Sequence, residues 1–120
     1  MANRNCADPP FRQETAIAKS GTQSVGIDIS KLTPRGLAVL VPAVWTAADL
    51  YFEVSEDNET FYPLYDEEGS IVLISGIATS EARVYAAPAT VWAVGSWPYM
   101  RLVASAAQGA ARTLVVAMLG

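Results

Sequence analysis

Apolar and polar residues alternate with a period of two along most of the chain. The clearest case is "DLYFEVSED", where Leu50, Phe52 and Val54 form the inward set. The outward set of the same stretch is Tyr51, Glu53 and Ser55. The stretch "SVGIDIS" likewise places Val25, Ile27 and Ile29 on one face. Successive side chains of a β-strand point to opposite sides, so this period predicts strands rather than helices.

The distribution of turn residues divides the chain into short strands. "GLAVLVPAVW" is apolar on both faces and is typical of a central strand that ends at Pro42. About eight or nine strands separated by turn signals predict an all-β fold, a jelly-roll-like antiparallel β-sandwich. The positions expected in its core are Leu37, Val39, Val41, Leu50, Phe52, Val54, Leu102, Leu114 and Val116. Phe61 and Leu64 are expected to point inward around the irregularity at Pro63.

The first thirteen residues show no periodicity. Pro9 and Pro10 favour an extended path, and Phe11 is the only large side chain of this segment. The sequence therefore predicts an N-terminal arm over residues 1–13 and a sandwich domain over residues 14–120. Such an arm is expected to be mobile in solution and to lie across a neighbouring subunit, with Pro9, Pro10 and Phe11 in contact.

Composition favours an assembled protein. Hydrophobic residues make up 52% of the 120 positions and charged residues only 17%, against about 25% charged in typical soluble domains. One small core cannot hold this excess, so part of it is expected to face other protein, including further copies in a homo-oligomer (dimer or trimer). The net charge of −4 with scattered basic residues argues against nucleic-acid binding. The longest uncharged run is broken by Pro88, Gly95 and Pro98, so no membrane span is expected.

The segment from Ser55 to Ser70 is unusually rich in acids. Its carboxylates, with that of the preceding strand residue, are Glu53, Glu56, Asp57, Glu59, Asp66, Glu67 and Glu68. One group of three flanks Asn58 and the other precedes Gly69, and such residues are typical of tight turns. The pattern therefore favours solvated hairpin turns over a catalytic carboxylate pair. A calcium site at the hairpin ends is the alternative, although the EF-hand spacing is absent.

No residue pattern points to an enzyme. The chain has no histidine, and Cys6 is its only cysteine, so a Ser-His-Asp triad, a Cys-His pair and a histidine metal site are excluded. The glycines form no phosphate-binding loop. We expect no catalytic residues, no cofactor and no resident metal.

The tryptophans are the strongest candidates for contact residues. Trp45 follows an apolar strand and is expected in the core. Trp92 and Trp97 lie in the irregular segment "TVWAVGSWPYM", close to Tyr99. They are expected either to cap one end of the sandwich or to serve as exposed anchors for a partner or a sugar ring.

Three phrases of the sequence resemble a family of small β-sandwich virion structural proteins of tailed bacteriophages and prophages. They are "ETAIAKSGTQSVGIDIS", "GLAVLVPAVWTAADLYFEVSEDNETFYPLYDEEGS" and "YMRLVASAAQGAARTLVVAML". The phrases cover most of residues 14–119, and the tip "EDNE" departs from the Asp-Gly common in that family. The resemblance implies a jelly-roll-like component without enzyme activity.

The function expected from this resemblance is that of a capsid decoration (cement) protein, which binds the major capsid (coat) protein and stabilises the shell. It would be made in the host bacterial cytoplasm, since the N-terminal residues carry no apolar signal-peptide core, and would reside on the capsid exterior. The alternatives are a head–tail connector, a tail or fibre-associated component, or a carbohydrate-binding jelly-roll module.

Overall fold

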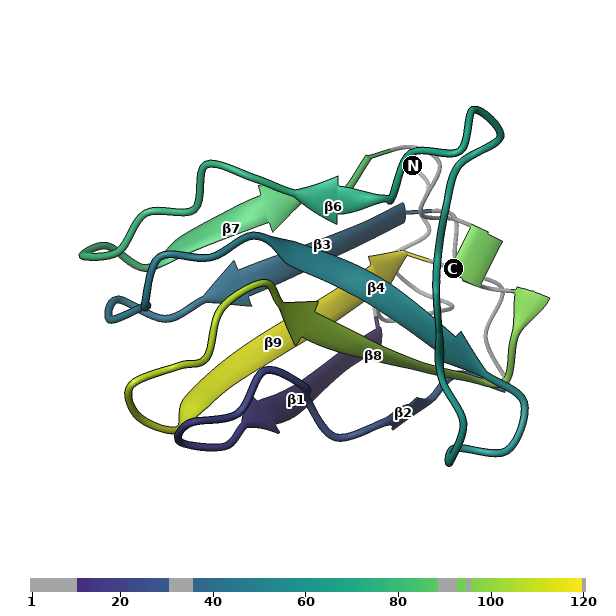
Figure 1. Cartoon of the computed structure of the whole chain (residues 1–120), viewed down its shortest axis with the longest axis horizontal. Helices are drawn as coiled ribbons and strands as arrows, with labels where there is room; N and C mark the ends of the chain where they lie inside the picture. Colours follow the sequence, from purple (N-terminus) through teal and green to yellow (C-terminus); the bar gives the residue numbers. More distant parts are fainter. Residues whose placement is uncertain (1–10, 31–35, 89–92, 95, 120) are drawn as a thin grey trace, which may run out of the picture.

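The computed structural model describes residues 11–30, 36–88, 93–94 and 96–119, and these form a β-sandwich (Figure 1). The described residues contain nine strands in two antiparallel sheets and no α-helix. The strands are β1 (Phe11–Ile17), β2 (Ile27–Asp28), β3 (Gly36–Val41), β4 (Leu50–Ser55), β5 (Tyr62–Pro63), β6 (Leu73–Ile74), β7 (Arg83–Ala86), β8 (Tyr99–Ala104) and β9 (Arg112–Leu119). The predicted all-β class is confirmed.

The strand order is that of a jelly roll. One sheet, called sheet A here, has the order β1-β9-β3-β7, and the other, sheet B, has the order β2-β8-β4-β5 with β6 also paired to β4. β5 pairs with the second half of β4 and β6 with the first half, so the two short strands act as one strand interrupted by residues 64–72. When β5 and β6 are counted as one, the chain has eight strands: the first pairs with the eighth, the second with the seventh, the third with the sixth and the fourth with the fifth. A long hairpin rolled up on itself gives this arrangement.

The core between the sheets contains all nine positions that the alternation predicted. They are buried, as is Trp45, whose indole N–H donates to the carbonyl of Ala48 at 3.2 Å. Phe61 and Leu64 are half-buried, and Leu64 packs against the core. The pattern of inward residues thus follows from the pleat of each strand.

Two positions of the alternation differ from the expectation. Val25 is 68% exposed, because buried residues Ser24 and Ile27 stand three positions apart and the phase shifts at Gly26. Ser55 was expected to face outward but is buried. Its hydroxyl oxygen accepts hydrogen bonds from the backbone N–H groups of Asp57 and Asn58, so it is held inside the hairpin tip.

The sandwich begins earlier than residue 14. Phe11, Arg12 and Gln13 belong to β1 and pair with Met118, Ala117 and Val116 of β9. The partner strand lies at the other end of the chain, so no local pattern could reveal this pairing. Of the arm predicted over residues 1–13, the first ten residues lie outside the described part of the chain.

Candidate protein interaction surfaces

The contact residues predicted near the N-terminus are only partly described. Pro9 and Pro10 lie outside the described residues. Phe11 is half-buried, packs against the core, and stands opposite Met118 in the β1–β9 register. The Phe11 side chain therefore has a partner within its own chain, and its role there is to close one margin of the core.

In the segment before β8, the tryptophan that the structure describes packs against the core of its own chain. Trp92 lies outside the described residues. Trp97 is half-buried and packs against the core, and its backbone N–H donates to the carbonyl of Val94 at 3.0 Å. Tyr99 begins β8, between Asp28 of β2 and Ser55 of β4. The Trp97 side chain is thus in contact with the core of its own chain.

The first acidic group builds the hairpin tip after β4. The Asp57 carboxylate oxygen Oδ1 accepts hydrogen bonds from the N–H groups of Glu59 at 2.9 Å and Thr60 at 3.0 Å, and from the Ser55 hydroxyl at 3.0 Å. These donors stabilise the ionised form and lower the pKa of Asp57 below its usual value, with Thr60 contributing most. Asn58 takes a positive φ of 63°, which asparagine tolerates better than most residues.

The second acidic group builds the turn within residues 64–72. Asp66 Oδ1 accepts from the N–H groups of Glu68 and Ser70, each at 2.9 Å, and Gly69 supplies a φ of 85°. In each group one aspartate forms the turn through its side chain, and the four glutamates are exposed, which agrees with the predicted solvated hairpin turns. Within the described ranges, no three acidic or cysteine side chains lie together in an arrangement suited to a metal ion.

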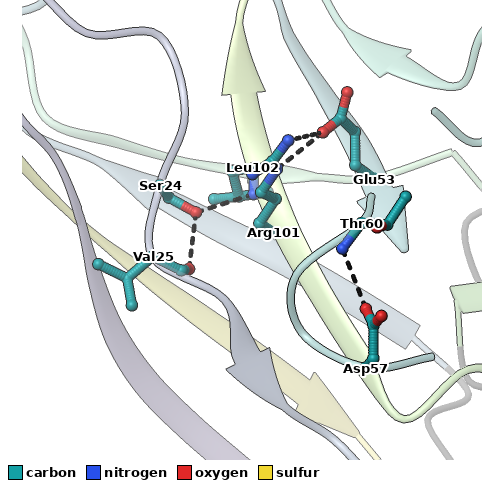
Figure 2. Close-up of polar contacts among 7 residues, drawn as sticks. All are labelled: Ser24, Val25, Glu53, Asp57, Thr60, Arg101 and Leu102. Atoms are coloured by element: carbon teal, nitrogen blue, oxygen red, sulfur yellow. Dashed lines mark hydrogen bonds and ion pairs between the residues drawn. The ribbon is translucent and has the colours of Figure 1, made fainter. Parts of the chain in front are cut away.

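An ion pair covers the outer side of sheet B. Arg101 of β8 stands opposite Glu53 of β4, and its Nε and Nη2 lie 2.7 and 2.6 Å from Glu53 Oε1 (Figure 2). The Arg101 guanidinium also stacks over the Phe61 ring, 4.1 Å from its centroid. The arginine thus ties β8 to β4 and to the segment after the hairpin tip, and its side chain remains only 17% exposed. This arrangement is a fixed structural element rather than a free cationic site.

A second set of polar contacts joins the loops at one end of the sandwich. Gln108, 1% exposed, accepts from the N–H of Thr46 at 2.9 Å and donates to the Thr46 carbonyl at 3.1 Å. Arg112 donates to both Gln108 Oε1 and Thr46 Oγ1. The sequence suggested only a loop of small residues here, and the lone glutamine within "SAAQGAA" was the available signal.

The outward face of sheet A carries apolar side chains from three neighbouring strands. In one row across the sheet, Val84 of β7, Leu40 of β3 and Val115 of β9 are neighbours; the next row contains Ala86, Ala38 and Ala117. Val84 is 67% exposed and Leu40 38%. We call these six residues the outer face of sheet A. The sequence signal was present, since "GLAVLV" is apolar on both sides; it predicted a central strand, and β3 lies between β9 and β7.

None of the described residues lies in a helix long and apolar enough to span a membrane.

Comparison with known proteins finds similarity at the level of structure. No protein-family model and no curated protein matches the chain. Among solved structures, the chain is similar to the SPBc2 prophage-derived protein YomS, with a TM-score of 0.52 and 12% sequence identity. The match covers 94% of this chain and 96% of that one. The two proteins therefore share the fold over nearly their full lengths.

Proposed function

We propose that this protein is a structural component of a bacteriophage or prophage virion, and that it acts as a capsid decoration protein bound to the exterior of the coat-protein shell. The observation that carries the proposal is the outer face of sheet A, where aliphatic side chains of β7, β3 and β9 lie side by side and Leu40 and Val84 are exposed. Surfaces of this kind are characteristic of protein partners.

Two further observations support a virion role. The sequence resembles small virion β-sandwich proteins, and the fold is shared with a protein whose name records a prophage origin. Because prophages encode proteins of many functions, the prophage origin of YomS supports only the phage context. The attachment role is supported by the apolar outer face of sheet A.

The outer face of sheet A is formed in the free protein, so binding to a shell does not require this surface to fold or rearrange. Alanine and valine side chains have few rotamers to lose, so binding them costs little conformational entropy. A shell presents many identical coat subunits, and each would cover the face of one decoration protein. The expected bound surface includes Leu40 and Val84, the most exposed large residues of this face.

The test is binding of the purified protein to shells assembled from the coat protein of the same phage or prophage. We expect the protein to sediment with the shells, and the double variant Leu40→Asp/Val84→Asp to bind at least about tenfold more weakly, because it places charge in a desolvated contact. Val44→Asp/Tyr65→Asp is the matched control, since it adds the same two charges at residues that are 63% and 55% exposed and lie outside sheet A. It should bind as the parent does.

Two results would contradict the proposal. If the parent protein fails to sediment with the shells while immunogold labelling places it on tails, the tail-component alternative replaces decoration. If Leu40→Asp/Val84→Asp binds as tightly as the parent while keeping its fold, attachment uses another surface.

A further inference from the structure

β1 leaves part of its outer edge open. β1 is the first strand of sheet A and pairs only with β9 within that sheet. At its end, the N–H of Val25 donates to the carbonyl of Ala16 at 3.3 Å, and Ile17 forms a bridge with Ser24. Residues 24–25 therefore close the edge beyond Thr15, whereas Phe11 to Thr15 have no neighbouring strand in the described chain on that side. A free edge presents backbone groups that can pair with another strand.

The bond to Val25 shows which backbone groups face this open edge. The Ala16 carbonyl points away from β9, and the direction of backbone groups alternates along a strand. The N–H and C=O groups of Arg12 and Glu14 therefore face the open edge too. In the monomer the Glu14 carbonyl accepts a hydrogen bond from the side-chain amide of Gln13 at 3.2 Å, so a side chain occupies the place of a strand partner.

The side chains at this edge are self-complementary in charge. Arg12 and Glu14 are both exposed and stand on the outward side of sheet A, opposite Ala117 and Val115. An antiparallel copy of β1 centred on Gln13 places Arg12 of each chain opposite Glu14 of the other. A register centred on Arg12 would instead oppose Arg12 to Arg12, and one centred on Glu14 would oppose Glu14 to Glu14. Opposite charges in directly facing positions stabilise a strand pair and like charges destabilise it.

We propose that two copies of this chain associate through the open edge of β1, in antiparallel pairing centred on Gln13, with two Arg12–Glu14 ion pairs. Arg12 and Glu14 form the hydrogen-bonded positions of this ladder, because their backbone groups face the edge. The two-fold axis is normal to the sheet, so the outer faces of the two copies of sheet A lie side by side. The association does not depend on a shell and so stands apart from the decoration role.

A depression beside Glu14 fits the incoming arginine. It is an open hollow of about 310 Å³ lined by Glu14, Thr15, Ala16, Val25 and Thr113. Val25 lies beside Ala16 at the edge of β1. In the proposed pairing, Arg12 of the second copy lies beside Glu14 in the same way, two residues further along the edge. The arginine stem can therefore lie against the exposed Val25 side chain while its guanidinium meets the carboxylate.

The test is sedimentation equilibrium of the purified chain over a range of concentrations, with charge-reversed variants. We expect a monomer–dimer equilibrium that weakens with added salt. Arg12→Glu and Glu14→Arg each turn both ion pairs into like-charge pairs and should raise the dimer Kd by roughly tenfold or more. The double variant Arg12→Glu/Glu14→Arg should restore it. An equimolar mixture of the two single variants should form heterodimers, which no contact within one chain explains.

Lys19→Glu is the control, since it makes the same charge change as Arg12→Glu at an exposed residue outside the edge. It should leave the dimer Kd unchanged. Hydrogen exchange of the parent chain gives a second measurement: the amides of Arg12 and Glu14 should gain protection as concentration rises. A parent chain that stays monomeric throughout, or single variants that fail to form heterodimers on mixing, would overturn the proposal.

Discussion

At the residue scale, stability depends on how completely each side chain leaves water. Phe52 of β4 is fully buried and is the largest such side chain in the described chain. Phe52→Ala should lower the free energy of unfolding by roughly 3–5 kcal/mol, because it removes apolar contacts and leaves a cavity. Urea denaturation measures this. Tyr62→Ala, at a residue that is 57% exposed, should change stability by less than about 0.5 kcal/mol; equal losses for both variants would show that Phe52 is not the core residue described.

The Asp57 carboxylate makes the stability of the folded chain depend on pH, in a direction that follows from its lowered pKa. Its pKa is lower in the folded chain than the ordinary value because the N–H groups of Thr60 and Glu59 and the Ser55 hydroxyl bind the carboxylate. Its stabilising contribution is therefore fully present above the ordinary pKa and is lost as the pH falls through the folded-state pKa.

Stability measured by urea unfolding between about pH 5 and about pH 2 should fall less steeply for Asp57→Asn than for the parent. Glu56→Gln, on the same hairpin tip, controls for the change in net charge. An NMR titration of the Asp57 carboxyl group should show a midpoint below the ordinary value of 3.8. A midpoint at or above that value would show that the backbone donors do not hold the carboxylate.

At the scale of elements, β1 shows how a strand is defined by its partner. Its first three residues account for three of the seven register pairs with β9, and Phe11 adds packing against the core. A chain that begins at Glu14 should therefore be less stable than one that begins at Phe11, by roughly 1–3 kcal/mol. Thermal unfolding of the two shortened chains, each with the same added methionine, measures the difference. Equal melting temperatures would mean that residues 11–13 contribute no stable pairing.

At the scale of the whole molecule, Gln108 stands where three loops that cross between the sheets meet. Its backbone exchanges hydrogen bonds with Ser20 and Gly21 of the β1–β2 loop, while its side chain binds Thr46 of the β3–β4 loop. Gln108 itself lies in the β8–β9 loop. These loops gather at one end of the sandwich (Figure 1). One residue, through its backbone and its side chain, thus joins connections from distant parts of the sequence.

Gln108→Ala should destabilise the protein by roughly 2–4 kcal/mol, because the Thr46 N–H and the Arg112 guanidinium lose an acceptor in a buried place. Chemical denaturation measures this loss, and Gln23→Ala, at an exposed glutamine, should be nearly neutral. If the two variants are equally stable, the hydrogen bonds of the Gln108 side chain contribute nothing to the stability of the sandwich.

The candidate surfaces were predictable to different degrees. The acidic turns were predictable from local sequence, because Asp and Asn side chains bind nearby backbone N–H groups and Asn and Gly tolerate positive φ. The role proposed for Arg12 and Glu14 was not predictable from local sequence, since it depends on β1 being an edge strand of sheet A. Of the contact residues predicted from aromatic and proline content, Phe11 and Trp97 pack within their own fold.

By itself the sequence determined that this chain forms strands, and it determined which side of most strands is apolar, because side-chain alternation is a local property of the backbone. The tertiary structure decided what no local pattern contains. It placed Phe11 beside Met118, enclosed Ser55 within a turn, and left the outward side of β3 uncovered. Pairing and burial depend on which strands become neighbours, and those neighbours come from opposite ends of the chain.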